Sequence, residues 1–243
     1  MSLSATLPSY KERLRDIVYL SFSMLRQKIA GKEISATNEA SLQHQFSVIL
    51  KQVGELYLFA SQDRLDIELE RDIELNEPTN KSPKKSARCD IWLTMRSSDG
   101  ASSSSAAIEI KYFKRGNFKK GVEATTDNRF ALLFDLENLE EYRRTLEDDN
   151  LLCYEVVYTN NPNYANEKST KSNADEYMVK LAPTIQQKAN RTIQRRTNTR
   201  GVITINQVVD LDHEYKADWI SYDQGDNTVL FLLVDLQREE HII

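Results

Sequence analysis

Residues 89–113, CDIWLTMRSSDGASSSSAAIEIKYF, indicate a β-hairpin at the centre of the fold. The two ends, 89–95 and 106–113, alternate in side-chain character, which is typical of strands. The intervening residues 96–105 are polar and contain an Asp-Gly pair and a run of serines, as expected for a hairpin connection. Because side chains alternate along a strand, each strand has one continuous apolar face and one face that carries ionisable groups.

Pairing the two strands brings these ionisable groups together. In one register Asp90 lies opposite Lys111, and in a register shifted by two residues it lies opposite Glu109. Side chains that lie directly opposite point to the same face, so either register gathers all three residues in one patch. Two carboxylates about 5 Å apart repel by roughly 3 kcal/mol at an effective dielectric constant of about 20. Lys111 relieves part of that repulsion, and a divalent cation would relieve more.

Two explanations of this patch stay open. The first is a cross-strand salt-bridge cluster on a solvated sheet face. The second is a cation site, which is favoured because Glu109 and Lys111 lie in an apolar strand and a basic segment, KRGNFKK, follows at once. Glu39 adds a further acid on the apolar stripe of the preceding helix. It is either an acid favoured by the helix dipole or an additional metal-orienting group.

The rest of the chain supplies helices and strands around the hairpin. The apolar spacing predicts helices over 8–30, from Asn38 to about Gly54, over 127–146 and over 175–196. It predicts strands over 64–75, 151–159, 201–211, 217–223 and 228–236. The first of these strands has an irregularity at Arg71-Asp72, and 151–159 is apolar enough for burial on both faces. This order predicts an α/β three-layer sandwich with a mixed central sheet, in which 151–159 is parallel to its neighbour after a helical crossover.

The spacing Asp90, eighteen residues, then Glu109-Ile110-Lys111 resembles the PD-(D/E)xK nuclease superfamily, which has the restriction-endonuclease-like fold. The local text ARCDIWL and AIEIKYFKR is also similar to the Arg-x-Asp-Ile and Ile-Glu-x-Lys segments of bacterial nucleases of this type. Cys89 stands where the proline of the family name would be, a position without a chemical role.

The resemblance also implies how the chain is organised. It covers roughly half of the sequence, because the element order over 38–159 matches the core of that fold. Residues 1–37 would then be an N-terminal helical addition. Residues 175–243 would be a C-terminal helix and strands, all within a single domain spanning 1–243.

The resemblance implies a Mg²⁺-dependent endonuclease that hydrolyses phosphodiester bonds of nucleic acid, with DNA as the expected substrate and a restriction, repair or defence role. Asp90, Glu109 and the backbone carbonyl of Ile110 would bind Mg²⁺, for which Mn²⁺ could substitute. Lys111 would orient the attacking water and help to deprotonate it, and Glu39 would be an accessory acid. Such hydrolysis needs a metal to polarise the phosphoryl oxygen and positive charge to stabilise the transition state.

Basic residues are the expected contacts to nucleic acid: Lys114, Arg115, Lys119, Lys120, Arg195 and Arg196. Such clusters can form a basic cleft on an acidic protein, but each could equally be a solvated face. The net charge of −5 argues against a general nucleic-acid binder. A homodimer is compatible with this class, whose members often cut both strands as dimers. The alternatives are a non-catalytic nucleic-acid-binding or protein-binding module that retains the fold, and a structural α/β domain.

Composition favours a cytoplasmic protein without a membrane partner. No apolar run approaches the ~18 residues that span a bilayer, and the N-terminus lacks a signal-peptide core. Cys89 and Cys153 lie in apolar strand-like segments, which is typical of buried thiols in a reducing compartment. The three histidines show no zinc-ligand spacing.

Overall fold

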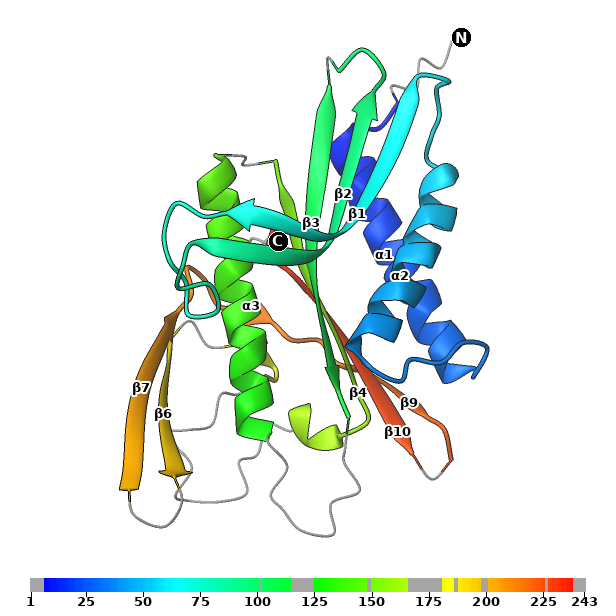
Figure 1. Ribbon diagram of the computed structural model, residues 1–243. Helices are drawn as coiled ribbons and strands as arrows, with labels where there is room; N and C mark the ends of the chain where they lie inside the picture. Colours follow the sequence, from blue (N-terminus) through cyan, green and yellow to red (C-terminus); the bar gives the residue numbers. More distant parts are fainter. Residues whose placement is uncertain are drawn as a thin grey trace, which may run out of the picture.

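The computed structural model describes residues 7–100, 102–114, 125–147, 150–165, 181–185, 188–197, 201–225 and 227–237. Within this part of the chain the protein is α/β, with a mixed six-stranded sheet and three α-helices (Figure 1). The helices are α1 (Tyr10–Ala30), α2 (Glu39–Glu55) and α3 (Thr125–Leu146). They confirm the helices predicted at 8–30, after Asn38 and at 127–146.

The central sheet has the strand order β1-β2-β3-β4-β10-β9. Its strands are β1 (Asp63–Glu74), β2 (Ser86–Ser97), β3 (Ser103–Phe113), β4 (Leu152–Thr159), β9 (Ile220–Asp223) and β10 (Thr228–Asp235). Neighbouring strands are antiparallel except for β3 and β4, which are parallel because α3 connects them as a crossover. The predicted hairpin and the predicted parallel strand are therefore both confirmed.

The helices form two layers, one on each face of this sheet. Helices α1 and α2 pack on one face, where Leu42, Phe46 and Leu50 of α2 are fully buried against the sheet. Helix α3 packs on the opposite face against β3 and β4. Strand β4 is buried along its whole length, as its apolar sequence predicts. The result is the α/β sandwich with a mixed sheet that the element order predicts.

A sharp bend interrupts the first two strands. The ladder between β1 and β2 keeps one register on both sides of Glu70, but Glu70, with φ of 55°, and Asp90 have no partner in that ladder. The predicted irregularity thus lies one residue before Arg71. Strand β2 pairs with β3 only as far as Ile91 opposite Ile108. Beyond that point β1 and β2 leave β3 together and arch across α3 (Figure 1). If the register of β2 and β3 is continued by one residue beyond Ile91, Asp90 lies opposite Glu109 and not opposite Lys111.

The helix predicted over 175–196 is wrong in the part that the structure describes. Residues Lys188–Thr197 form strand β6, which pairs in antiparallel fashion with β7 (Gly201–Asp210), and Thr184–Ile185 (β5) pairs with Tyr215–Lys216 (β8). The partner strand GVITINQVVD has strong β-propensity and satisfies the backbone of β6, which outweighs the helix propensity of its Lys, Gln and Arg residues. Residues 175–180 lie outside the described part.

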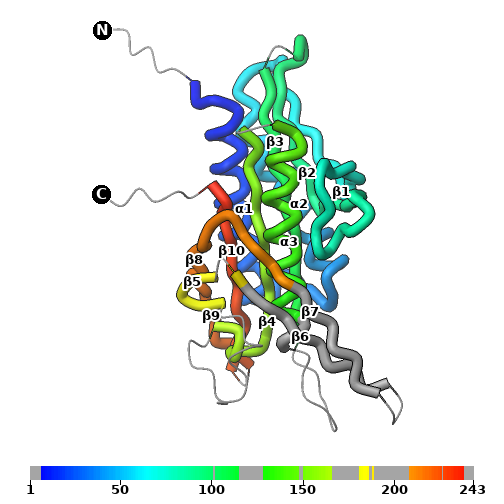
Figure 2. Tube along the Cα trace, turned by 90° about the vertical axis from the view of Figure 1, so that its left-hand side faces the viewer, coloured from blue at the N-terminus to red at the C-terminus, as the bar shows by residue number. Residues whose placement is uncertain are grey.

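Distant parts of the chain meet on the α1 side of the sheet. Helix α1 and strand β10 lie side by side (Figure 2), and the Tyr19 hydroxyl donates a hydrogen bond to Asp235 at 2.8 Å. In the described part of the chain, no helix combines the length and the apolar character needed to cross a membrane. Cys89 and Cys153 are both buried and are not joined by a disulfide.

Candidate functional site

A group of buried charges lies between α3 and the sheet, and we call it the acidic cluster. Glu109 of β3 and Glu155 of β4 are direct neighbours in the parallel ladder, and both are fully buried. Asp135 of α3 is also fully buried. Two lysines complete the cluster: Lys111 of β3, and Lys81 of the loop between β1 and β2. Strand pairing and helix packing therefore bring five charges together from four segments of the chain.

The carboxylates of this cluster are bridged by the two ammonium groups. Lys81 Nζ lies 2.9 Å from Glu109 Oε2 and 2.5 Å from Asp135 Oδ1. Lys111 Nζ contacts the other oxygen of Asp135. The Tyr142 hydroxyl of α3 donates a hydrogen bond to Glu109 Oε1 at 2.9 Å. Both oxygens of Glu109 are thus engaged, and Asp135 lies between two lysines.

Asp90 lies beside this cluster, at the bend of β2. Its Oδ2 accepts a hydrogen bond from the backbone N–H of Ile110 at 2.7 Å. This bond links β2 to β3 just beyond their last ladder pair, Ile91 opposite Ile108. The backbone carbonyl of Asp90 accepts from Gln43 Nε2 at 2.6 Å, and the same nitrogen donates to Glu70. Gln43 of α2 therefore ties both strands of the bend to the helix layer.

Glu39 approaches from the first turn of α2. The Asn38 side chain accepts a hydrogen bond from the Ser41 N–H at 2.8 Å and the Ser41 hydroxyl accepts from the Asn38 N–H, which fixes where the helix begins. Glu39 Oε1 lies 4.0 Å from Lys111 Nζ, and its Oε2 accepts from the Tyr112 N–H at 3.4 Å. The structure thus places the predicted residues Glu39, Asp90, Glu109, Ile110 and Lys111 around one stretch of β3.

Burial dominates the electrostatics of these groups. It raises the pKa of Asp90 to about 6, against the lowering effect of Lys111. Burial, followed by the charge of Asp135, also raises the pKa of Glu109 and raises that of Glu155 well above its ordinary value. Burial alone would lower the pKa of Lys81, but the carboxylates of Glu109 and Asp135 outweigh it and raise that pKa. The positive charge of the two lysines therefore does not offset the burial of Asp90, Glu109 and Glu155.

The carboxylate of Glu155 is the least compensated of these acids. Neither of its carboxylate oxygens has a hydrogen-bond partner among the described residues, although the side chain is fully buried. A buried carboxylate without a partner carries a large desolvation penalty, and it relieves that penalty by taking up a proton or by gaining a nearby cation. The cluster can therefore accept further positive charge.

The donor atoms fit a hard divalent cation. Mg²⁺ prefers carboxylate and carbonyl oxygens, and Asp90, Glu109 and the carbonyl of Ile110 offer such a set. In the present arrangement, however, no group of three or more His, Cys, Asp or Glu side chains within the described residues is placed to hold a metal ion. An ammonium, that of Lys81, lies between Glu109 and Asp135 instead. The chemistry of the residues fits the ion, but their arrangement would have to change to bind it.

Several residues of the site were not predicted. Glu155 has a visible signal, because it is the one charged residue in LCYEVVYT of β4. Asp135 has a weaker one, since it lies between Phe134 and Leu136 in an apolar stretch of α3. Lys81 belongs to a polar loop, and nothing in its neighbourhood distinguishes it from other loop lysines. The contacts of Gln43 and Tyr142 in the site depend on three-dimensional packing alone.

The basic residues expected to contact nucleic acid are placed less completely. Lys114 is exposed and directly follows β3, the strand that carries Lys111. Arg115, Lys119 and Lys120 lie outside the described residues. Arg195 and Arg196 belong to β6, hence to a strand and not to the predicted basic helix, and their side chains are outside the described part.

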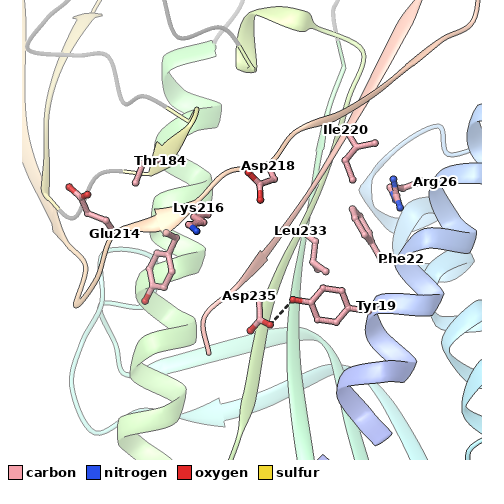
Figure 3. A pocket seen from close by; sticks show the side chains of 11 residues that line it. Tyr19, Phe22, Arg26, Thr184, Glu214, Lys216, Asp218, Ile220, Leu233 and Asp235 are labelled. Atoms are coloured by element: carbon pink, nitrogen blue, oxygen red, sulfur yellow. Dashed lines mark hydrogen bonds between the residues drawn. The ribbon is translucent and has the colours of Figure 1, made fainter. Parts of the chain in front are cut away.

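A cavity of about 390 Å³ lies elsewhere, between α1 and strands β8 to β10 (Figure 3). It is lined by aromatic, aliphatic and charged side chains, among them Tyr19, Phe22, Arg26, Lys216 and Asp218. In Figure 3 Tyr19 points toward Asp235, to which it is hydrogen-bonded. None of the predicted site residues lines this cavity, which is therefore separate from the acidic cluster.

Comparisons with protein-family models, with curated proteins and with solved structures found no match to this chain. The function has to be inferred from the site itself.

Proposed function

We propose that the protein is a Mg²⁺-dependent nuclease of the PD-(D/E)xK type, with a restriction-endonuclease-like fold, that hydrolyses phosphodiester bonds of nucleic acid. The observation that carries the proposal is the convergence of Asp90, Glu109 and Lys111 where β2 departs from β3, beside buried carboxylates that outnumber the local cations. The mixed sheet, with its hairpin, crossover helix and parallel strand, supports the same class.

Each residue has a chemical task in this proposal. Asp90, Glu109 and the carbonyl of Ile110 would hold the cation. When bound, Mg²⁺ polarises a phosphoryl oxygen and lowers the pKa of a bound water. Lys111 would orient the attacking water and stabilise negative charge on the phosphate, and Asp135 holds its ammonium in place. Glu39 would act as an accessory acid at the exposed rim of the site.

The proposed nuclease class also implies a metal preference, a substrate, an oligomeric state and a compartment. Mn²⁺ would replace Mg²⁺, DNA is the first substrate to test, and Lys114 and the neighbouring basic segment would contact phosphates. A homodimer would allow cleavage of both strands. The buried thiols of Cys89 and Cys153 are compatible with action in a reducing compartment such as the cytoplasm.

A cleavage assay tests the proposal. Plasmid DNA, single-stranded DNA and RNA are incubated with the protein in Mg²⁺, Mn²⁺ or EDTA. Glu109→Gln and Lys111→Ala are run alongside Glu74→Gln, a control that neutralises an exposed glutamate of β1. We expect metal-dependent cleavage that falls at least about 100-fold in the two site variants, because metal binding supplies several kcal/mol of transition-state stabilisation. Equal cleavage by Glu109→Gln and the control, or no cleavage of any substrate, would overturn it.

A second candidate is a non-catalytic nucleic-acid-binding or protein-binding module that retains this fold. It is favoured by one observation, the direct bridging of Glu109 and Asp135 by the Lys81 ammonium, because carboxylates neutralised by lysine need no metal. A mobility-shift assay in EDTA separates the two candidates. Binding that is unaffected by metal, together with no cleavage, would support the module.

A further inference from the structure

Lys81 differs from the other members of the acidic cluster in its origin. Glu109, Lys111 and Glu155 come from central strands, and Asp135 comes from α3, whereas Lys81 comes from residues 76–85 of the loop between β1 and β2. We call this segment the strap. The Lys81 side chain is 34% exposed, while those of Glu109 and Asp135 are 0% and 1% exposed. The lysine thus reaches into the cluster from the solvent side.

The strap is attached to α3 by polar contacts. The Asn80 N–H donates to Glu137 Oε2 at 2.8 Å, its side-chain amide donates to the other oxygen at 3.0 Å, and the Glu77 N–H donates to Glu141 Oε1 at 2.9 Å. The strap follows the buried residue Leu75, but its own sequence NEPTNKSPKK contains no large apolar side chain. Thr79 and Ser82 make buried contacts with Asn138 of α3. Water can replace the hydrogen bonds of Glu77 and Asn80, so this attachment is easier to release than packed core.

A strap so attached can present its lysine or withdraw it. The ammonium of Lys81 occupies the space between the carboxylates of Glu109 and Asp135, and it contacts one oxygen of each. A second cation at those oxygens competes with the ammonium, because the two positive charges repel at contact distance. A metal ion held through Glu109 Oε2 would therefore displace Lys81.

We propose that Lys81 is a tethered cation that neutralises the acidic cluster when no metal is bound, and that a divalent cation binds by expelling Lys81 and releasing the strap. This inference rests on the proposed function, since it concerns how the same site admits its metal. Asp135, freed from Lys81 on release, becomes an additional acid beside the cation. The strap thereby lowers the apparent metal affinity, because only the fraction of molecules with an open strap can bind.

Metal binding measured without nucleic acid tests this inference. Mn²⁺ is titrated by calorimetry into the wild type, Lys81→Gln, and the matched control Lys84→Gln, which removes the same charge from an exposed position of the strap. We expect Lys81→Gln to bind Mn²⁺ about 10-fold more tightly or better, and Lys84→Gln to bind as the wild type does. Glu109→Gln defines the site, because its Mn²⁺ binding should be lost.

A second variant covers the case in which Lys81→Gln does not fold. Asn80→Ala keeps Lys81 but removes the side-chain hydrogen bond to Glu137, and we expect it to bind Mn²⁺ a few-fold more tightly than the wild type. Hydrogen exchange gives an independent signal: the amides of Glu77 and Asn80 should exchange faster when Mn²⁺ is added, since their bonds to α3 break.

The outcomes separate this inference from the proposed function. Mn²⁺ affinity that is unchanged or weaker in both Lys81→Gln and Asn80→Ala, with binding still dependent on Glu109, would overturn the tethered cation alone. It would identify Lys81 as a permanent counter-charge. The absence of Mn²⁺ binding in the wild type and in every variant would overturn the proposed metal site, and this inference with it.

Discussion

The two faces of the central sheet are built from alternate residues of the same strands, yet they differ in chemistry. On β3, Ile108 and Ile110 point to α1 and α2 and join a continuous apolar core. Glu109 and Lys111, their neighbours in sequence, point to α3, where charges are buried among apolar residues. Both faces therefore have an apolar core, but the α3 face buries a larger group of ionisable side chains within it.

This difference separates stability from function. Burying ion pairs costs desolvation energy that their attraction often fails to recover, so apolar residues of similar size are usually as stabilising or more so. The packing of apolar residues on the α1 and α2 face follows from the hydrophobic effect. The α3 face buries two lysines and Glu155, which has no hydrogen-bond partner among the described residues. Their burial costs stability, which favours a chemical role. Four predictions test this division, from the largest expected effect to the smallest.

Loss of packing on the apolar face should have the largest effect on stability. Phe46 of α2 is fully buried, and Phe46→Ala should lower the free energy of unfolding by about 3–5 kcal/mol, through lost burial and the cavity that remains. Val48→Ala, at a 40% exposed position of the same helix, should change it by less than about 0.5 kcal/mol. Urea unfolding measures both, and equal losses would contradict the assignment of Phe46 to the core.

The apolar face was also the more predictable one. Period-two alternation determines which side chains of a strand share a face. The sequence therefore predicts the hairpin, the apolar face of each of its strands, and the convergence of Asp90, Glu109 and Lys111. The two registers considered differ by two residues and keep the same faces. The choice between them depends on the geometry of the hairpin turn, because the observed pairing of Ile91 with Ile108 is what places Asp90 opposite Glu109.

Much of the α3 face could not be predicted because its contacts depend on packing without a sequence period. Lys81 reaches Glu109 from a loop, and Asp135 faces the cluster only because of how α3 rotates on the sheet. The error at β6 has a related cause. Lys, Gln and Arg favour helix locally, but pairing with the β-branched residues of β7 decides the outcome.

A pH titration should reveal the charged face. Burial raises the pKa of Glu140 in α3 to about 7, against hydrogen bonds from Tyr215 and Asp212. Folded Glu140 therefore binds a proton more readily than unfolded Glu140 between about pH 4.5 and pH 7, so its contribution to stability is highest below this window and falls as pH rises through it. Each pKa unit corresponds to about 1.4 kcal/mol, which limits the loss to about 3 kcal/mol. Chemical unfolding at pH 5 and pH 8 should show this loss reduced in Glu140→Gln, and an unchanged pH dependence would refute it.

Neighbouring residues of β4 allow a direct comparison of the two faces. Glu155 faces the acidic cluster without a hydrogen-bond partner among the described residues, whereas Val156 belongs to the apolar core. Glu155→Met removes a buried unpaired carboxylate and should stabilise the protein by about 2 kcal/mol. Val156→Met overfills a packed site and should destabilise it by about 1–3 kcal/mol. Opposite signs in urea unfolding would support the division, and destabilisation by both substitutions would argue that Glu155 is a structural part of the core.

The smallest effect concerns the first turn of α2, which contributes both to helix stability and to the candidate site. Asn38 caps this helix, and Ser9 caps α1 with the same reciprocal hydrogen bonds. Asn38→Ala and Ser9→Ala should each lower the free energy of unfolding by about 1 kcal/mol. Only Asn38→Ala should also weaken metal-dependent cleavage, because it loosens the turn that holds Glu39 near Lys111. Equal cleavage by both variants would assign Glu39 to the helix dipole alone, so that the charged site would be confined to the sheet and α3.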